Sequence, residues 1–257
     1  MDLSKEFLRN VLKSTNLEER YIPILLNRID DYQKAFTSKA YDSVNNYELY
    51  EILGDATANW ALLWYFYRTF PQLHCANGVK TYARLKINYS DTESFSRIAD
   101  SLGFWPYIKA NDDEKLASKP KLLEDVFESF IGATSVFLDD HFGYPGVGAQ
   151  IVYNIIASLY DKIDISLKDE DLYDAKTRLK EIFDKASVKE QWGSIKYQHI
   201  DGRTDLYFVK NAIFTKISTG YGNTKVSQEK EAAKQAIAYL AQRGIDTKKK
   251  VRLLCEP

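Results

Sequence analysis

The most constraining feature of this 257-residue chain is a set of carboxylates inside two apolar segments. Glu48, Glu51 and Asp55 lie three or four residues apart in the run Glu-Leu-Tyr-Glu-Ile-Leu-Gly-Asp, and Asp125 and Glu128 lie three apart in a second run. Both runs are too apolar for a helix that faces water. Because a buried charge costs free energy unless something compensates it, the two segments predict a bound cation.

Helical periodicity predicts where these carboxylates point. Glu51 and Asp55 fall on one face of a helix, Glu48 falls one turn earlier on the same side, and Asp125 and Glu128 share a face of a second helix. If the two helices pack together, like charges converge, which is unfavourable without cations. Carboxylate oxygens favour Mg²⁺ or Mn²⁺. Such an ion activates water and stabilises a phosphoryl displacement, so the pattern predicts metal-dependent phosphodiester hydrolysis.

Charge is distributed unevenly along the chain. Residues 171–257 contain 17 Lys and Arg against 11 Asp and Glu, whereas residues 1–170 contain 18 against 25. The basic part suits a polyanion and the acidic part suits metal cations, which indicates two domains. The expected order is an all-α domain, a polar linker, a small α+β domain and a basic tail, over residues 1–163, 164–173, 174–244 and 245–257.

The first domain is predicted to be helical. The uncharged stretch 56–67 predicts a central helix buried on every side, with Trp60 and Trp64 in the core and Asp55 at its edge. Pro71 ends this helix, since proline cannot continue it. The predicted helices cover residues 48–70, 91–102, 120–140 and 145–162.

After the linker the periodicity changes from helical to alternating. Alternating apolar residues predict three strands, and Asp201-Gly202 predicts the first turn. Ser227 is the predicted N-cap of a final helix. The order is therefore helix, three strands, helix, with the elements over residues 174–186, 195–199, 206–209, 213–217 and 227–242.

The composition argues against a secreted, membrane-spanning or disulfide-rich protein. No run of about 18 apolar residues occurs, so neither a secretion signal nor a membrane span is predicted. Cys75 and Cys255 do not resemble a disulfide framework, which favours an intracellular, cytoplasmic compartment. The three histidines lack metal-binding spacing and are interpreted as structural. Glu124, beside Asp125, is interpreted as a solvated charge.

The two carboxylate segments resemble the signature motifs of the ribonuclease III family. Residues 48–56 match the pattern Glu-Arg-Leu-Glu-Phe-Leu-Gly-Asp-Ala at both glutamates and at the Leu-Gly-Asp-Ala end. Residues 125–133 are similar to Asp-Ala-Phe-Glu-Ala-Leu-Ile-Gly-Ala. The resemblance spans roughly residues 20–160. Tyr47 stands where the family usually has Asn or another polar residue, and Ile52 replaces a phenylalanine that the family often uses at its dimer contact.

This resemblance implies a role for each acid. Glu51, Asp125 and Glu128 would be catalytic metal ligands, Asp55 would complete the site and help to position water or a second metal, and Glu48 would be a supporting acid. It also implies Mg²⁺ as cofactor, with Mn²⁺ as a substitute. The expected reaction is hydrolysis of double-stranded RNA to 5′-phosphate and 3′-hydroxyl ends by a homodimer.

The second domain resembles a double-stranded-RNA-binding domain. Residues 174–181 are similar to the start of its first helix, and Lys230-Glu231-Ala232 is similar to the lysine motif of its last helix. Glu229 occupies the place of the first lysine of that motif. The resemblance implies salt-sensitive binding of RNA phosphates, with Lys248–Lys250 as a flexible supplement. The lysines expected to bind RNA are Lys176, Lys225, Lys230 and Lys234.

Two other functions stay open. The first is a catalytically silent structural protein of the same fold that binds double-stranded RNA, although such relatives typically lose acidic ligands that this chain keeps. The second is an all-α metal phosphohydrolase of nucleoside triphosphates, which also pairs Glu-x-x-Glu with a second acidic helix. Neither Gly54 nor a basic α+β domain is explained by that second function.

Overall fold

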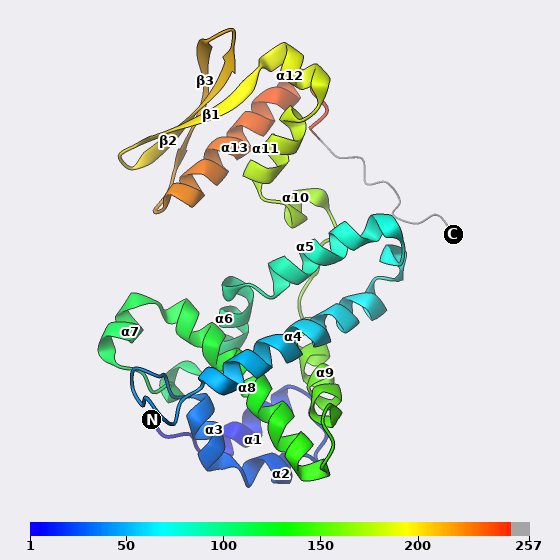
Figure 1. Cartoon of the computed structure of the whole chain (residues 1–257), viewed down its shortest axis with the longest axis vertical. Helices are drawn as coiled ribbons and strands as arrows, with labels where there is room; N and C mark the ends of the chain where they lie inside the picture. The colour runs from blue at the N-terminus through cyan, green and yellow to red at the C-terminus, as the bar shows by residue number, and fades with distance from the viewer. Residues whose placement is uncertain (248–257) are drawn as a thin grey trace. The chain divides into compact units, whose positions relative to one another are not determined.

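The computed structural model describes residues 1–247, which form two compact units (Figure 1). Unit 1 covers residues 1–165, and unit 2 begins at Ser166. Unit 1 is built from helices, and unit 2 combines helices with a three-stranded antiparallel sheet. This confirms the predicted fold class, an all-α domain followed by a small α+β domain. Lys248–Lys250 and Cys255 lie outside the described residues.

The helices of unit 1 begin and end at recognisable local signals. Asp91 caps its helix by accepting a hydrogen bond from the Ser94 N–H, and Gly143 ends another helix in the left-handed conformation. Short 3₁₀ turns occupy Pro71–Leu73, Ala76–Gly78 and Trp105–Tyr107. The α-helices are α1 (Lys5–Ser14), α2 (Ile22–Leu26), α3 (Ile29–Ala35), α4 (Glu48–Thr69), α5 (Val79–Tyr89), α6 (Thr92–Ser101), α7 (Asp112–Ala117), α8 (Lys119–Phe142) and α9 (Val147–Tyr160).

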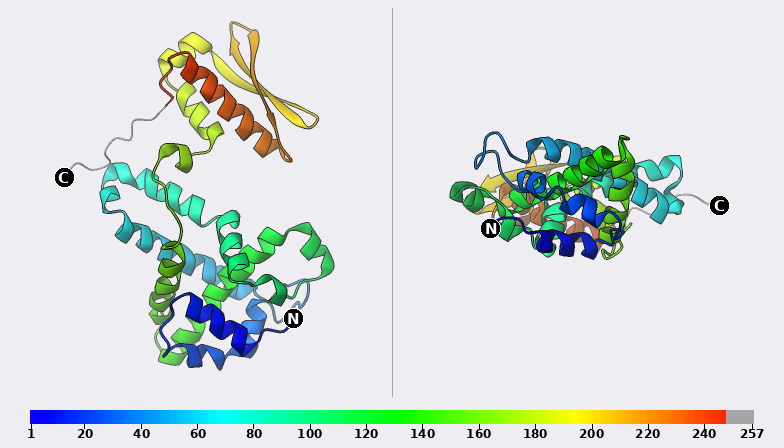
Figure 2. Two further views of the ribbon diagram at one scale, coloured as in Figure 1. Left: turned by 180° about the vertical axis from the view of Figure 1, so that it is seen from behind. Right: turned by 90° about the horizontal axis from the view of Figure 1, so that it is seen from below.

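Helix α8 is the central element of unit 1. Every residue from Leu122 to Ser135 is buried. Helices α4, α6 and α9 pack around α8. The left-hand view of Figure 2 shows the unit from behind, with α1 (dark blue) in front. A helix covered on all sides is expected to be apolar all round, so the three acids within this buried stretch, Glu124, Asp125 and Glu128, are conspicuous.

Helix α4 is buried on one side only. A row of apolar side chains at helical spacing runs along its exposed side, and Ile52 in this row is 69% exposed. The prediction that α4 is buried on every side, with Trp60 and Trp64 in the core, is therefore wrong. We call this row the α4 stripe; it consists of Leu49, Ile52, Leu53, Trp60, Leu63, Trp64 and Tyr67.

Two glycines bring α4 and α8 into backbone contact. A Cβ atom on Gly54 would lie 1.7 Å from the carbonyl oxygen of Glu128, and a Cβ on Gly132 would lie 2.0 Å from the carbonyl oxygen of Tyr50. Only glycine fits at either position. The crossing therefore holds the first turns of α4 directly against the acidic part of α8.

Unit 2 packs two helices on one face of its sheet (Figure 1). The strand order is β1-β2-β3, and both pairs are antiparallel. Leu206 and Phe208 of the central strand pack against Leu179 and Phe183 in the core. The elements are α10 (Asp169–Leu172), α11 (Ala175–Phe183), α12 (Ala186–Trp192), β1 (Ser194–Ile200), β2 (Arg203–Lys210), β3 (Ile213–Tyr221) and α13 (Lys225–Gln242).

Three local features of unit 2 differ from prediction. Helix α12 was not expected, and α10 lies in the stretch predicted as a linker. The N-cap of α13 is Thr224, whereas Ser227, the predicted cap, is the N3 residue. Their side chains form a capping box, in which each hydroxyl accepts a hydrogen bond from the other residue's N–H. Ser227 therefore lies at the correct end of the helix, but it is the N3 residue of the capping box, whose hydroxyl accepts the N–H of the N-cap residue Thr224.

Within residues 1–247, no helix has the length and apolar character needed to cross a bilayer.

Candidate metal centre

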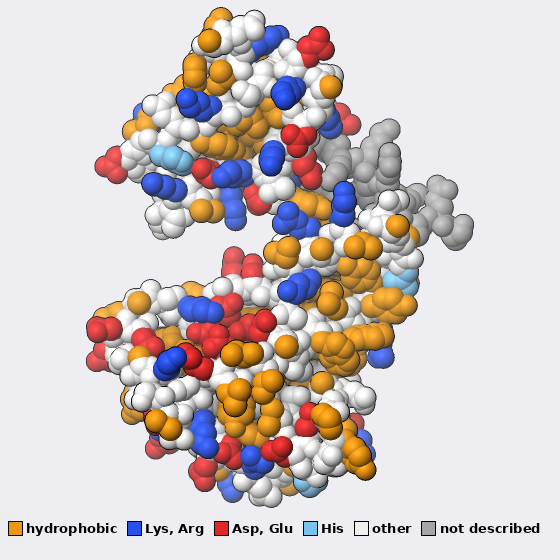
Figure 3. All heavy atoms as spheres, in the orientation of Figure 1, with side chains coloured by type: hydrophobic (Ala, Val, Ile, Leu, Met, Phe, Trp, Pro, Cys, Tyr) orange, Lys and Arg blue, Asp and Glu red, His pale blue; other side chains and the backbone are white. Residues whose placement is uncertain are grey.

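Three of the predicted acids converge at the crossing of α4 and α8. Glu51 comes from the first turn of α4, and Asp125 and Glu128 come from successive turns of α8. One carboxylate oxygen from each lies within 4.8 Å of the other two. On the face of unit 1 drawn in Figure 3, acidic side chains gather near the start of α8, beside hydrophobic side chains over α4. The close approach at Gly54 and Gly132 is what brings these two helices together.

Burial makes this cluster electrostatically unfavourable without a cation. Desolvation raises the pKa of Glu128 to about 8, with smaller contributions from the charges of Asp55 and Glu124. Burial, followed by the charge of Asp125, raises the pKa of Glu51. Burial also raises the pKa of Asp125, although the ammonium of Lys121 opposes it. Three carboxyls with raised pKa values at one point favour a bound cation.

Lys121 and Glu124 belong to the centre but were not predicted to. The Nζ atom of Lys121 lies 2.7 Å from Oδ1 of Asp125 and 3.1 Å from Oε2 of Glu124. Glu124 is only 8% exposed, so the interpretation of Glu124 as a solvated charge is wrong. The spacing of Lys121 from these acids, i,i+3 and i,i+4, is the sequence signal that could have predicted both contacts.

Tyr47 is a further contact of the cluster. Its hydroxyl donates a hydrogen bond to Oδ2 of Asp125 at 3.2 Å. The sequence marks Tyr47 only as a departure from the family pattern. Its position four residues before Glu51 places it at the start of α4, and only the packing of α4 on α8 brings its ring to Asp125.

Asp55 and Glu48 lie outside the group of three. Asp55 is exposed, and its Oδ1 accepts a hydrogen bond from Asn59 at 2.6 Å, while its charge still raises the pKa of Glu128. Glu48 forms an ion pair with Lys39 at 2.8 Å. The structure therefore brings together three of the five predicted acids, with Asp55 next to them and Glu48 turned toward another partner.

The donor set fits a hard divalent cation. Oxygen ligands lie about 2.1 Å from Mg²⁺, so neighbouring ligand atoms are about 3 to 4 Å apart. The three carboxylates already lie within 4.8 Å of one another. Among residues 1–247, no lysine, arginine or histidine forms an ion pair with Glu51 or Glu128, so their charges remain available for such an ion.

The predicted RNA-binding lysines of unit 2 lie in two different environments. Lys225, Lys230 and Lys234 are exposed along the first half of α13. Lys176, near the start of α11, instead forms an ion pair with Glu229 of α13. The charge of Lys176 is thus neutralised within the domain.

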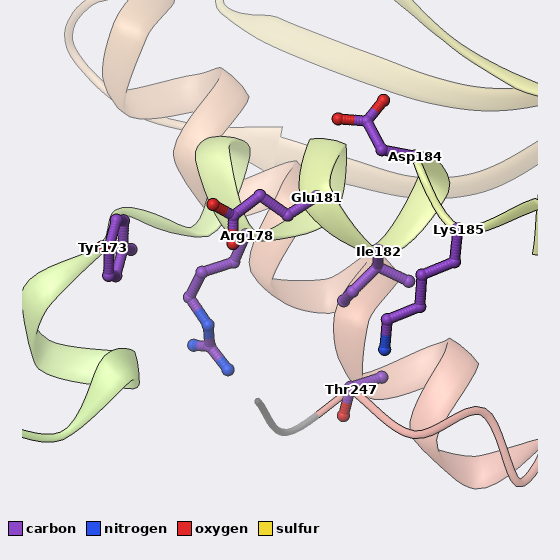
Figure 4. A pocket seen from close by; sticks show the side chains of 7 residues that line it. All are labelled: Tyr173, Arg178, Glu181, Ile182, Asp184, Lys185 and Thr247. Atoms are coloured by element: carbon purple, nitrogen blue, oxygen red, sulfur yellow. The ribbon is translucent and has the colours of Figure 1, made fainter. Parts of the chain in front are cut away.

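A separate pocket of about 230 Å³ lies in unit 2 beside α11 (Figure 4). Arg178 and Lys185 line it together with Glu181 and Asp184, so its basic and acidic residues balance. It contains none of the predicted site residues. This charge balance favours neither a metal ion nor a polyanion, and the carboxylate cluster of unit 1 remains the candidate site.

Comparison with known proteins gives a consistent set of relatives. Residues 48–140 match a family model described as the ribonuclease III domain. The chain is 40% identical over 241 residues to a putative ribonuclease 3 of Frog virus 3; the match covers 93% of this chain but 63% of that protein. It is 37% identical over 256 residues to a putative ribonuclease 3 of Invertebrate iridescent virus 6, covering 92% and 87%. Identity to the ribonuclease 3 of Lactobacillus acidophilus is 31% over 246 residues, covering 91% and 98%.

Proposed function

Since this chain belongs to the ribonuclease III family, we propose that it is an endoribonuclease that hydrolyses double-stranded RNA with a divalent metal ion. The observation that carries the proposal is the convergence of Glu51, Asp125 and Glu128 within 4.8 Å where α4 crosses the buried helix α8. Buried acids at one point, with raised pKa values, are typical of a functional site.

The proposed cofactor is Mg²⁺, with Mn²⁺ as a substitute. Glu51, Asp125 and Glu128 would hold it, and the all-oxygen donor set supports this choice over softer metals. When bound, such an ion lowers the pKa of water and stabilises the charge that develops on a phosphoryl group. Asp55, exposed beside Glu128, would orient the attacking water, and Glu48 would support the edge of the site.

The proposed reaction leaves a 5′-phosphate and a 3′-hydroxyl. The chain's own residues would bind and orient the strand and exclude bulk water from the buried side of the cluster. Lys121 keeps its charge beside Asp125, because the two neighbouring carboxylates raise its pKa despite its burial. Its ammonium therefore limits the net negative charge that an RNA phosphate meets at this point.

Unit 2 is proposed to bind the RNA duplex. Lys225, Lys230 and Lys234 are exposed on one helix and would contact phosphates. Lys176 would contribute only when its ion pair with Glu229 is broken. Affinity from a few lysines is expected to fall steeply with salt, because phosphate contacts release counterions.

The proposed assembly is a homodimer. The α4 stripe supports it, since a continuous exposed apolar row on a helix marks an interaction surface. Ile52, the family's dimer-contact position, lies within the stripe and is 69% exposed. Contact through α4 would also place the carboxylate clusters of two copies in one assembly, because Glu51 lies next to Ile52 on this helix.

The test of this function is cleavage of a long RNA duplex by the purified full chain with Mg²⁺. Glu128→Gln keeps the shape of the side chain but removes its charge, and we expect it to lower the cleavage rate at least about a hundredfold. Glu93→Gln is the matched control, because Glu93 is an exposed glutamate paired with Arg97 on α6. The products should carry 5′-phosphates on sequencing.

Two outcomes would replace the proposal. Duplex binding that survives EDTA, without turnover in any divalent cation, would instead support a silent structural protein of the same fold. Release of pyrophosphate from a nucleoside triphosphate would support the all-α phosphohydrolase. If Glu128→Gln cleaves RNA as fast as the parent protein, the carboxylate cluster is not the active site.

A further inference from the structure

Tyr47 connects the two helices that carry the metal-binding acids. Its ring is buried, with 6% exposure, and its hydroxyl donates to Oδ2 of Asp125 on α8. Its carbonyl oxygen accepts the N–H of Glu51 at 2.8 Å and the hydroxyl of Ser129 at 3.4 Å. Its own N–H donates to the carbonyl oxygen of Thr37 at 2.9 Å. The residue is therefore fixed by contacts with α8, with α4 and with the preceding loop.

The Asp125 carboxylate is held at both of its oxygens. Oδ2 accepts the hydrogen bond from Tyr47, and Oδ1 lies 2.7 Å from Nζ of Lys121. A hydrogen bond at one oxygen and an ion pair at the other together restrain the plane of a carboxylate and its rotamer. Lys121 reaches Asp125 from the preceding turn of the same helix, whereas Tyr47 reaches it from α4. Tyr47 thus ties the orientation of Asp125 to the helix that carries Glu51.

The Tyr47 hydroxyl is a neutral hydrogen-bond donor to the Asp125 carboxylate. Burial is the main cause that raises the pKa of Tyr47, and the charge of Asp125 raises it further. A neutral donor restrains the carboxylate without neutralising it. This differs from Lys121, whose positive charge competes with a metal cation for the same acid.

We propose that Tyr47 is a positioning residue that orients Asp125 for metal binding. The proposal rests on the function proposed above. Hydrogen bonds from outside the ligand set fix the geometry of a metal ligand, and their loss typically weakens metal binding about 10- to 100-fold. Phenylalanine fills the same space, so the hydroxyl is the one group that Tyr47→Phe removes.

The structure offers a matched control for this substitution. Tyr32 is fully buried in the same unit, and its hydroxyl shares a 2.7 Å hydrogen bond with Thr134, also on α8. Tyr32→Phe therefore removes a buried hydroxyl that contacts the same helix, but one that touches no carboxylate. A purely structural role for Tyr47 would make the two variants behave alike.

The experiment is a titration of the full chain with Mn²⁺ in the absence of RNA, followed by electron paramagnetic resonance of the free ion. We expect Tyr47→Phe to bind Mn²⁺ about tenfold more weakly and Tyr32→Phe to bind it like the parent protein. Both should show a similar fall in melting temperature in EDTA. In cleavage, Tyr47→Phe should need more Mg²⁺ for half-maximal rate and approach the parent rate at saturation.

A second substitution keeps the test decisive. If Tyr47 acts through Asp125, then adding Tyr47→Phe to Asp125→Asn should change Mn²⁺ affinity no further. Parent-like Mn²⁺ affinity in Tyr47→Phe, or equal weakening in Tyr32→Phe, would overturn the inference. Glu128→Gln separates the two proposals: if it binds Mn²⁺ like the parent protein, the metal centre itself is wrong. If it loses Mn²⁺ while Tyr47→Phe does not, only the role of Tyr47 fails.

Discussion

At the scale of single residues, the behaviour of the site is set by the burial of Glu128. Its pKa of about 8 in the folded protein lies above the ordinary value of 4.5. Between these values the folded chain holds a proton that the unfolded chain has released. The free energy of unfolding of the metal-free protein therefore falls as pH rises through this window. A bound cation removes this cost, because it favours the ionised carboxylate.

The first prediction is a pH dependence of metal binding. Because Glu128 must lose a proton to bind a cation, Mn²⁺ affinity should rise by roughly tenfold per pH unit between about pH 6 and pH 7.5. The measurement is a calorimetric titration in two buffers of different ionisation enthalpy, which counts the protons released. Affinity that is flat over this range, with no proton release, would contradict the assigned role of burial at Glu128.

At the scale of elements, two contacts between helices determine which acids lie together in unit 1 and which lysine of unit 2 is held in an ion pair. The contact of α4 with α8 depends on Gly54, where any side chain would meet the backbone of Glu128. The contact of α11 with α13 places Glu229 between Lys176 and His199, whose Nε2 lies 3.3 Å from the Glu229 carboxylate. The first contact assembles the carboxylate cluster, and the second neutralises Lys176, one of the lysines proposed to bind RNA.

The second prediction concerns this contact of α11 with α13. Glu229→Gln should free the ammonium of Lys176 and tighten duplex binding severalfold, with about one more unit of slope in log affinity against log salt. Fluorescence anisotropy at several salt concentrations measures both quantities. Glu231→Gln is the control, since Glu231 lies on the same helix and its side chain accepts a hydrogen bond from Gln235. Equal effects in both variants would mean that the net charge of the domain, and not the release of Lys176 from its ion pair, sets the duplex affinity.

At the scale of the whole molecule, the α4 stripe is the feature that a single copy leaves unexplained. Its seven residues repeat at helical spacing over most of a 22-residue helix. An apolar helix indicates burial, but the pattern is the same whether the covering surface belongs to the same chain or to another. The family membership and this exposure together support a second copy as the covering surface.

The third prediction tests this assembly. Leu63→Glu places a charge in the middle of the α4 stripe, at a position 43% exposed in the single chain, so the unit should still fold. We expect sedimentation velocity to show a dimer for the parent protein and a monomer for this variant. Leu116→Glu, at an 85% exposed leucine of α7, should leave the dimer unchanged. A monomeric parent protein, or a dimeric Leu63→Glu variant, would contradict the proposed interface.

The sequence alone predicted a large part of the fold because its signals are local. Asp91 begins α6, Pro71 follows the end of α4, and alternating residues mark the three strands. It missed α12 and placed the N-cap of α13 at Ser227 instead of Thr224, since either hydroxyl can cap a helix. The family was likewise identified from two contiguous motifs, which require no knowledge of packing.

What the sequence determined by itself was which acids share a helix face, because helical spacing fixes that within a few residues. The family resemblance assigned Glu51, Asp125 and Glu128 as metal ligands, but only the tertiary structure shows that their carboxylates lie together while Asp55 and Glu48 lie outside the cluster. The tertiary structure also brought in Tyr47 and buried Glu124. The physical reason is that these outcomes depend on how two helices cross, and that crossing depends on shape complementarity between residues about 80 positions apart.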